Sequence, residues 1–178
     1  MGALEYYTYD DYVNWEGKWE LIDGEALAMA PSPMKTHQQI AYALSFELNR
    51  SIENCAVCHV FGEEDYIIDE GTILKPDVVL MCNDNDDNFI TKAPEIVIEV
   101  ISKSTARRDE EYKFKIYEKE KVKYYILAYP DSLRVKIFKL HNFTYQKEGD
   151  FFNQEYVFKD LVCQASIDFK KVFKKFRK

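Results

Sequence analysis

One stretch of the chain, Glu95-Ile96-Val97-Ile98-Glu99-Val100-Ile101-Ser102, limits the available folds more than any other. Its β-branched residues favour a strand, and its continuous apolar character is typical of a strand that is covered on both faces. Burying the carboxylate of Glu99 within such a run is costly unless a cation or hydrogen-bond donors hold it. The sequence therefore predicts a central strand whose internal acid has dedicated partners.

A second acid stands at the start of the preceding apolar stretch. The segment Lys75-Pro76-Asp77-Val78-Val79-Leu80-Met81 opens with charged residues around a proline and then becomes wholly apolar. Only an acid-rich loop at residues 83–88 and a short connection separate it from the Glu99 strand, so the two strands are expected to be neighbours. Two buried acids on neighbouring strands indicate a site for a divalent metal ion, which prefers oxygen ligands.

Size and charge narrow the class of protein. The chain has 178 residues, 47% of them hydrophobic, which is enough for one sizeable core, so we expect a single domain over residues 1–178. The net charge of -7 gives no global attraction to nucleic acid, although residues 170–178 carry six positive charges. That basic tail is typical of a solvated helix end, and it is also suited to contact a phosphate backbone. No apolar stretch is long enough to span a membrane and no signal-peptide pattern is visible, so a cytoplasmic location is expected.

The four cysteines are expected to be free thiols in such a reducing compartment. The segment Cys55-Ala56-Val57-Cys58-His59 has the spacing of covalent haem attachment. We reject haem, because that chemistry needs export and a distal ligand. A structural zinc site would need a second pair of cysteines or histidines at suitable spacing, and none is evident along the chain.

The order of expected elements is helix, hairpin, helix, three strands, helix, strand, hairpin and helix. Segregated strands together with one strand–helix–strand crossover predict a mixed α/β (α+β) sheet flanked by helices. Residues 56–68 are interpreted as a strand pair or one bent strand, with a turn or bulge at Gly62. The remaining elements are a short helix after Thr8, a hairpin over 19–30 with an Asp23-Gly24 turn, helices over 35–52, 105–121 and 168–176, and strands over 122–128, 134–140, 145–149 and 155–158.

This order of elements and acids resembles the core of the PD-(D/E)xK nucleases, and more closely the Uma-type family of restriction-endonuclease-like proteins. The resemblance implies a restriction-endonuclease-like fold with a nuclease core at about residues 35–128, an N-terminal hairpin and a C-terminal strand extension. It also implies a metal-dependent, homodimeric endonuclease that hydrolyses DNA. It spans residues 6–140 and is carried by Glu20 to Glu25, His37, Lys75-Pro76-Asp77, Pro94, Val97 to Ser102, Ser104-Thr105, Asp109, Lys113, Tyr117 and Val122 to Tyr125.

The resemblance implies that Asp77 and Glu99 bind Mg²⁺, or Mn²⁺ in its place. A lysine would orient or deprotonate the attacking water, or stabilise the developing charge. In the parent superfamily this lysine follows the second acid by two residues, where the present chain has Ile101. The Uma-type pattern moves the lysine onto the next helix, and Lys113 is the matching residue.

Further candidates lie on either side of these residues. Asp109, Lys113 and Tyr117 are spaced four apart, so they would share one face of a helix. The resemblance also places Glu25 near the site as an additional carboxylate, and His37 as a hydrogen-bonding or proton-transfer group. From the residues alone, Glu25 belongs to a hairpin turn and His37 is an ordinary residue at a helix start.

Three functions stay open on the sequence. The first is a metal-dependent DNA endonuclease, and the second is a nucleic-acid-binding or regulatory module that keeps the nuclease fold without catalysis. The third is a dimeric interaction protein whose aromatic strands form the interface. Because the body of the chain is acidic, either a local basic groove attracts a duplex, or the substrate is small or is delivered by a partner. The candidates for such a groove are Lys35, Lys75, Lys103, Arg107 and Arg108.

Overall fold

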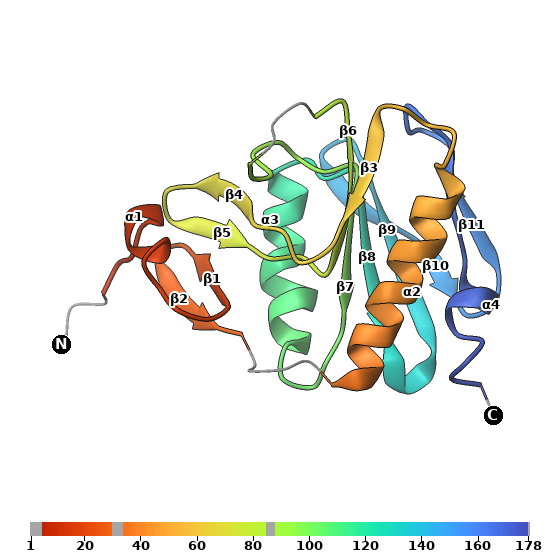
Figure 1. The fold of residues 1–178 in the computed structure, drawn as a ribbon, viewed down its shortest axis with the longest axis horizontal. Coiled ribbons are helices and arrows are strands. Elements are labelled where there is room, and N and C mark those ends of the chain that lie inside the picture. Colours follow the sequence, from red (N-terminus) through yellow and green to blue (C-terminus); the bar gives the residue numbers. More distant parts are fainter. Residues whose placement is uncertain (1–4, 30–33, 85–87, 178) are drawn as a thin grey trace.

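The computed structural model describes residues 5–29, 34–84 and 88–177. Its centre is a six-stranded mixed sheet with the strand order β10-β9-β8-β7-β6-β3 (Figure 1). β7 and β8 are parallel, and the other neighbouring strands are antiparallel. The bounds are Cys58–Phe61 for β3, Val78–Cys82 for β6, Ile96–Val100 for β7, Tyr124–Tyr129 for β8, Arg134–His141 for β9 and Thr144–Phe151 for β10. The prediction of a mixed sheet flanked by helices is confirmed.

Both faces of the central sheet are covered, as the apolar runs predict. The long helix α2 (Lys35–Ser51) packs on one face, and α3 (Phe114–Lys119) packs on the other (Figure 1). Ile98 and Val100 belong to the α2 side, whereas Val97 belongs to the α3 side. Because successive side chains of a strand alternate, Glu99 points to the α3 side. Among the described residues, no helix has the length and apolar character needed to cross a bilayer.

A second, four-stranded sheet has the order β2-β1-β5-β4. Its hairpin turns at Asp23 and Gly24, whose φ angles are 50° and 79°, so the predicted Asp-Gly hairpin is confirmed. Tyr66 of this sheet stacks on Tyr117 of α3, which joins the sheet to the core on the α3 side. The bounds are Trp19–Ile22 for β1, Glu25–Ala28 for β2, Tyr66–Asp69 for β4 and Thr72–Leu74 for β5; α1 (Tyr9–Tyr12) precedes them.

The interpretation of residues 56–68 as one strand pair or one bent strand is wrong. β3 pairs with β6 in the central sheet, whereas β4 pairs with β5 in the second sheet. The chain passes from one sheet to the other around Gly62. Local alternation of side chains predicts that a strand exists, but it does not specify the partner strand.

The C-terminal part forms a small unit on the α2 side of the central sheet (Figure 1). β11 (Glu155–Phe158) pairs with β12 (Ala165–Asp168), a strand that the sequence pattern did not predict, and α4 (Phe169–Val172) follows. The basic tail is more than a solvated helix end. Its Val172 and Phe173 are buried in the core, as is the preceding Phe169, while its Lys170, Lys171, Lys174 and Lys175 are exposed.

The expectation of free thiols is wrong in this structure, because two disulfides pair the four cysteines. Cys58 and Cys82 lie directly opposite each other in β3 and β6. Cys55, just after α2, is bonded to Cys163 in the connection between β11 and β12. The bonded cysteines are separated by 24 and 108 residues along the sequence, so no local spacing pattern predicts either pair.

Candidate functional site

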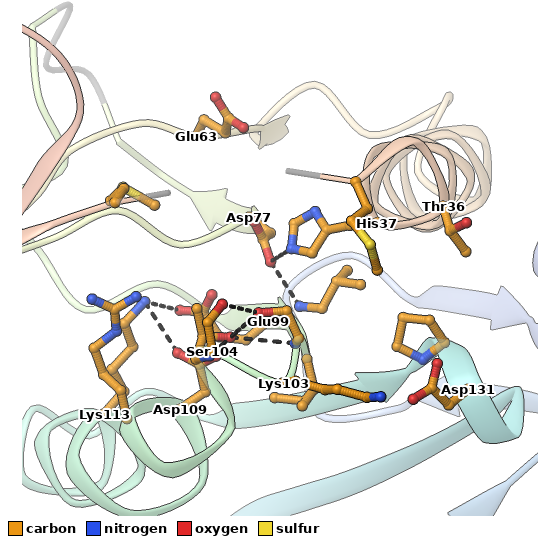
Figure 2. A pocket seen from close by; sticks show the side chains of 18 of the residues that line it. Thr36, His37, Glu63, Asp77, Glu99, Lys103, Ser104, Asp109, Lys113 and Asp131 are labelled. Atoms are coloured by element: carbon orange, nitrogen blue, oxygen red, sulfur yellow. Dashed lines mark hydrogen bonds and ion pairs between the residues drawn. The ribbon is translucent and has the colours of Figure 1, made fainter. Parts of the chain in front are cut away.

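A cavity of about 520 Å³ lies at the edge of the central sheet where β6 begins and β7 ends (Figure 2). Four of the five predicted site residues, Asp77, Glu99, Lys113 and His37, line it. They come from the start of β6, from β7, from the helical segment that precedes α3, and from the first turn of α2. The fold therefore brings together residues that are widely separated in the sequence.

Asp77 connects β6, β7 and α2 through one carboxylate oxygen. Its Oδ2 accepts a hydrogen bond from the backbone N–H of Val100 at 2.7 Å, and it lies 3.2 Å from Nε2 of His37. Burial lowers the pKa of His37, but the hydrogen bond and the charge of Asp77 outweigh this effect, so the pKa rises above 6.5. The imidazole is thus held as a hydrogen-bond donor to Asp77.

Glu99 is buried, with 3% of its surface exposed. Its Oε1 accepts hydrogen bonds from Nζ of Lys113 at 2.9 Å and from the hydroxyl of Tyr117 at 3.0 Å. Burial raises the pKa of Glu99 well above 4.5; Lys113 opposes the rise, and the acids Asp109 and Asp77 add to it. The predicted need of this acid for a cation and a donor is therefore met by the α3 side of the sheet.

Lys113 is enclosed by three carboxylates and is only 2% exposed. Its Nζ lies 2.6 Å from Glu20, 2.9 Å from Glu99 and 3.6 Å from Asp109. Burial lowers the pKa of Lys113, but the charges of Glu20, Glu99 and Asp109 outweigh burial and raise the pKa above 10.5. The ammonium group therefore remains protonated at neutral pH.

The helix that carries Lys113 is not regular. Residues Arg108–Lys113 form a π-helix, and α3 continues from Phe114. The hydroxyl of Tyr125 in β8 donates a hydrogen bond to the carbonyl of Asp109 at 2.8 Å, so a side chain engages a helix carbonyl at the widened turn. Asp109, Lys113 and Tyr117 are all buried on the side of Glu99, so the predicted shared face is present although the predicted regular helix is not.

Glu20, and not Glu25, is the acid of the first hairpin that reaches the site. Glu20 is fully buried in β1; one carboxylate oxygen contacts Lys113, and the other lies 3.4 Å from Arg108. Glu25 is exposed at the start of β2 and is not among the residues that line the cavity. The signal for Glu20 was present in the run Trp19-Glu20-Leu21-Ile22, where an acid interrupts apolar residues as Glu99 does.

Basic residues also reach the cavity. Of the five candidates for a basic groove, Lys103 and Arg108 line it, and Lys18, which the sequence did not single out, joins them. Lys103 is exposed, and Figure 2 shows its side chain extending toward Asp131. The other three candidates, Lys35, Lys75 and Arg107, are not among the lining residues.

The donor set of the cavity suits a divalent metal ion. Lys113 and Tyr117 both contact Oε1 of Glu99, and His37 and Val100 both contact Oδ2 of Asp77. The second oxygen of each carboxylate is not used by these four partners. The four acids of the site, Glu20, Asp77, Glu99 and Asp109, face the permanent cations Lys113 and Arg108, so a divalent cation would balance their excess negative charge.

We expect the Glu99 contribution to make the free energy of unfolding of the metal-free protein fall as the pH rises above 4.5, and the Glu99→Gln variant to show a smaller fall. The raised pKa makes the folded chain hold the Glu99 proton, whereas the unfolded chain releases it near 4.5. This contribution is therefore complete below 4.5 and is lost as the pH rises through the folded pKa. Denaturant unfolding of both proteins in chelator measures the difference, and parallel pH profiles would contradict the prediction.

Comparisons with protein-family models and with solved structures place the chain among known proteins. The family model described as "Uma2: Putative restriction endonuclease" matches residues 4–165. A crystal structure of a "putative nuclease belonging to DUF820" from Anabaena variabilis ATCC 29413 has 16% sequence identity and a TM-score of 0.74, and the match covers 94% of this chain and 97% of that chain. At this identity the likeness shows the fold alone.

A second solved structure, the type IIG restriction endonuclease BpuSI, also has 16% identity, and the match covers 76% of this chain and 15% of that chain. Its TM-score of 0.39 is too low to support an argument. The search of curated proteins gives no match. The family model covers most of the chain, and the chain therefore belongs to the Uma2 family of putative restriction endonucleases.

Proposed function

We propose that the protein is a metal-dependent endonuclease that hydrolyses phosphodiester bonds of DNA. Asp77 and Glu99 are the proposed ligands of one Mg²⁺ ion, which Mn²⁺ can replace, and Lys113 is the displaced catalytic lysine. One observation carries the proposal: both carboxylates line the same cavity, each with one oxygen engaged by the protein and the other not used by those partners. Membership of the Uma2 family supports the same reaction class.

The metal, when bound, would stabilise charge on the scissile phosphate and lower the pKa of a water molecule. The residues of the chain then have separate tasks. Because Lys113 stays protonated, we assign it stabilisation of developing charge and orientation of water, and not proton abstraction. We assign Glu20 and Asp109 the positioning of its ammonium group, which both carboxylates contact together with Glu99.

His37 and Glu25 receive different assignments. We assign His37 the positioning of Asp77, because Nε2 contacts that carboxylate at the edge of the cavity. Its Nδ1 is buried, and the ring meets Asp77 through Nε2. Glu25 has no part in the proposed mechanism, since its side chain is exposed away from the cavity.

Binding of DNA to an acidic protein requires local attraction at the cavity. Lys18, Lys103 and Arg108 supply positive charge there, and the metal ion would add to it. We propose a homodimer, because two copies related by a two-fold axis would present one site to each strand of a duplex. Sedimentation velocity gives the mass in solution, and a monomer under all conditions would contradict this part.

The test is a plasmid cleavage assay with purified protein in Mg²⁺, in Mn²⁺ and in chelator. We expect nicked and linear DNA in either metal and intact supercoiled DNA in chelator. DNA binding without cleavage in either metal would overturn the proposed nuclease activity and favour a nucleic-acid-binding protein that keeps the nuclease fold without catalysis. Equal cleavage in chelator would show that the activity belongs to a contaminant or to a metal-independent mechanism.

A further inference from the structure

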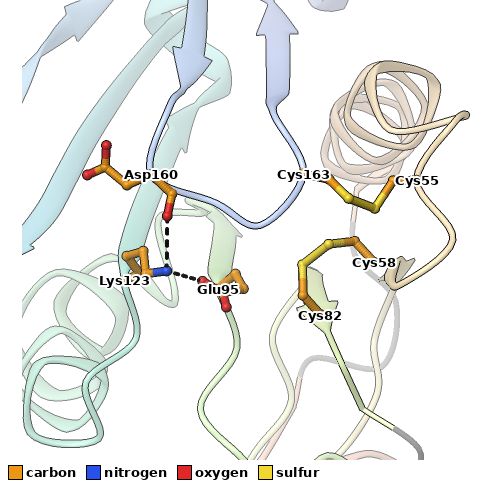
Figure 3. The surroundings of a disulfide bond; sticks show 7 residues. All are labelled: Cys55, Cys58, Cys82, Glu95, Lys123, Asp160 and Cys163. Atoms are coloured by element: carbon orange, nitrogen blue, oxygen red, sulfur yellow. Dashed lines mark hydrogen bonds and ion pairs between the residues drawn. A yellow bond between two sulfur atoms is a disulfide. The ribbon is translucent and has the colours of Figure 1, made fainter.

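The four cysteines gather at the opposite end of β6 from Asp77, on the α2 side of the central sheet. Cys58 begins β3, Cys82 ends β6, Cys55 follows α2, and Cys163 lies between β11 and β12 (Figure 3). The sulfur atoms of Cys55, Cys58 and Cys163 all lie within 4.8 Å of one another, and Cys82 is bonded to Cys58. Three segments that are distant in the sequence, namely residues 55–58, Cys82 and Cys163, thus bring their sulfur atoms to one place.

We propose that, in its reduced state, this cluster of four cysteines binds one Zn²⁺ ion, and that the two disulfides are the oxidised alternative. A tetrahedral zinc site with Zn–S bonds of about 2.3 Å separates its sulfur atoms by about 3.8 Å. Cys58 lies within 4.8 Å of both Cys55 and Cys163, and these two, which a disulfide holds closer together than a zinc site requires, would move apart on reduction. The chain has no second pair of cysteines at a suitable local spacing, but the fold supplies the second pair from β6 and from the β11–β12 connection.

The surroundings hold the cluster in place without the disulfides. Cys58 is 3% exposed and belongs to the core between α2 and the sheet, and the other three cysteines pack against that core. The backbone also fixes the cluster, because the N–H of Cys55 donates to Ile52 at 2.8 Å and the N–H of Asn83 donates to Val57 at 2.7 Å. A site that the fold prepares in this way loses little conformational entropy when it binds a metal.

Four thiolates select a soft or borderline metal ion, and among these zinc forms closed tetrahedral sites without redox chemistry. Converting the two disulfides into thiols takes four electrons and four protons, which two molecules of a dithiol reductant supply while each is oxidised to a disulfide. Zinc then displaces protons from the thiols as its bonds to sulfur form. In a chain that has never been oxidised, the same thiols bind zinc directly.

The bound ion would have a structural role. It would join the end of α2, the β11–β12 connection, β3 and β6 at one point, whereas the two disulfides join α2 to the β11–β12 connection and β3 to β6 separately. The cluster is separate from the proposed nuclease site, since Cys82 and Asp77 flank opposite ends of β6. Metal bound by sulfur is therefore distinguishable from metal bound by carboxylates.

The experiment measures metal in the full-length protein, purified with a phosphine reductant and without chelator. We expect one zinc ion per chain by elemental analysis. Titration of the zinc-free reduced protein with Co²⁺ should produce the thiolate-to-cobalt charge-transfer band and the intense visible bands of a tetrahedral site. The Cys55→Ser/Cys163→Ser variant should lose both signals, whereas Asp77→Asn/Glu99→Gln, which alters only carboxylates, should keep them.

Fully reduced wild-type protein tests the zinc site even if a cysteine variant fails to fold. Alkylation and mass spectrometry confirm that all four thiols are present in this sample. Absence of zinc and of the cobalt charge-transfer band in that sample would overturn the proposal. A cobalt spectrum without sulfur charge transfer, or a zinc content that disappears in the Asp77→Asn/Glu99→Gln variant, would also overturn it by assigning the metal to the carboxylates. Oxidised protein that keeps both disulfides is expected to bind no zinc at the cluster.

Discussion

The Asp77→Asn and Glu99→Gln variants should each lose Mg²⁺-dependent DNA cleavage by at least about 10³-fold, equivalent to about 4 kcal/mol of transition-state stabilisation. Each substitution keeps the size of the side chain and removes the charge that we assign to metal binding. Single-turnover cleavage of a labelled duplex at saturating Mg²⁺ measures the loss. Because the Asn and Gln side chains can still accept the hydrogen bonds from Val100 and Lys113, the fold should survive.

The matched control for these variants is Glu111→Gln, which neutralises an exposed acid. Glu111 lies in the π-helical segment Arg108–Lys113, and its carboxylate pairs with the exposed Arg107. Its cleavage rate should stay within about twofold of the parent, since exposed ion pairs contribute little. Titration of Mg²⁺ adds a second readout, because loss of a ligand raises the metal concentration needed for half-maximal cleavage. Asp77→Asn and Glu99→Gln proteins that cleave like the parent would eliminate the proposed metal site.

The Lys113→Met variant should be destabilised by about 3–5 kcal/mol and should lose cleavage by about 10²–10³-fold. Methionine fills a similar volume but leaves Glu20, Glu99 and Asp109 without the ammonium group that lies between them. Arg108 still lies near Glu20, but Glu99 and Asp109 lose their cation partner and must then keep protons or take up water. Denaturant unfolding and single-turnover cleavage measure the two losses separately.

A double variant shows whether the loss of stability in Lys113→Met arises from uncompensated negative charge. Adding Glu20→Gln to Lys113→Met removes one of the three acids, so we expect recovery of about 1–3 kcal/mol of stability without recovery of cleavage. The control Lys115→Met places methionine at an exposed position two residues away and should change stability by less than about 0.5 kcal/mol. If Lys113→Met were as stable as Lys115→Met, the buried network would not have the energetic role assigned to it.

The site residues that stand out against their neighbours in the sequence were predictable. Glu99 stands out because an acid within an apolar strand demands partners, and Asp77 stands out because it begins the neighbouring strand. Lys113 followed from the family resemblance together with helical spacing, and the buried face that it shares with Asp109 and Tyr117 is present. The same argument applies to Glu20, the fourth acid of the site, whereas the family resemblance pointed to Glu25.

Features that depend on distant pairing were not predictable. The separation of β3 and β4 into two sheets depends on which strands they pair with, and their own sequences do not indicate those partners. The cysteine cluster depends on two pairings that form only when α2, β3, β6 and the C-terminal strands have packed together. The π-helical turn at Arg108–Lys113 depends on a contact between Tyr125 and the helix backbone, which is invisible in the spacing of the helix residues.

The parallel pairing of β7 and β8 has a consequence for how such proteins diversify. Parallel strands end at the same edge, so the connections that follow β7 and β8 both border the cavity, with Ser104 contributed by the first and Asp131 by the second. The proposed site residues are anchored elsewhere, at the start of β6, on β7 and on the π-helical turn that carries Lys113. Changing the short segments around Ser104 and Asp131 would therefore reshape the rim of the cavity and leave the proposed site residues in place.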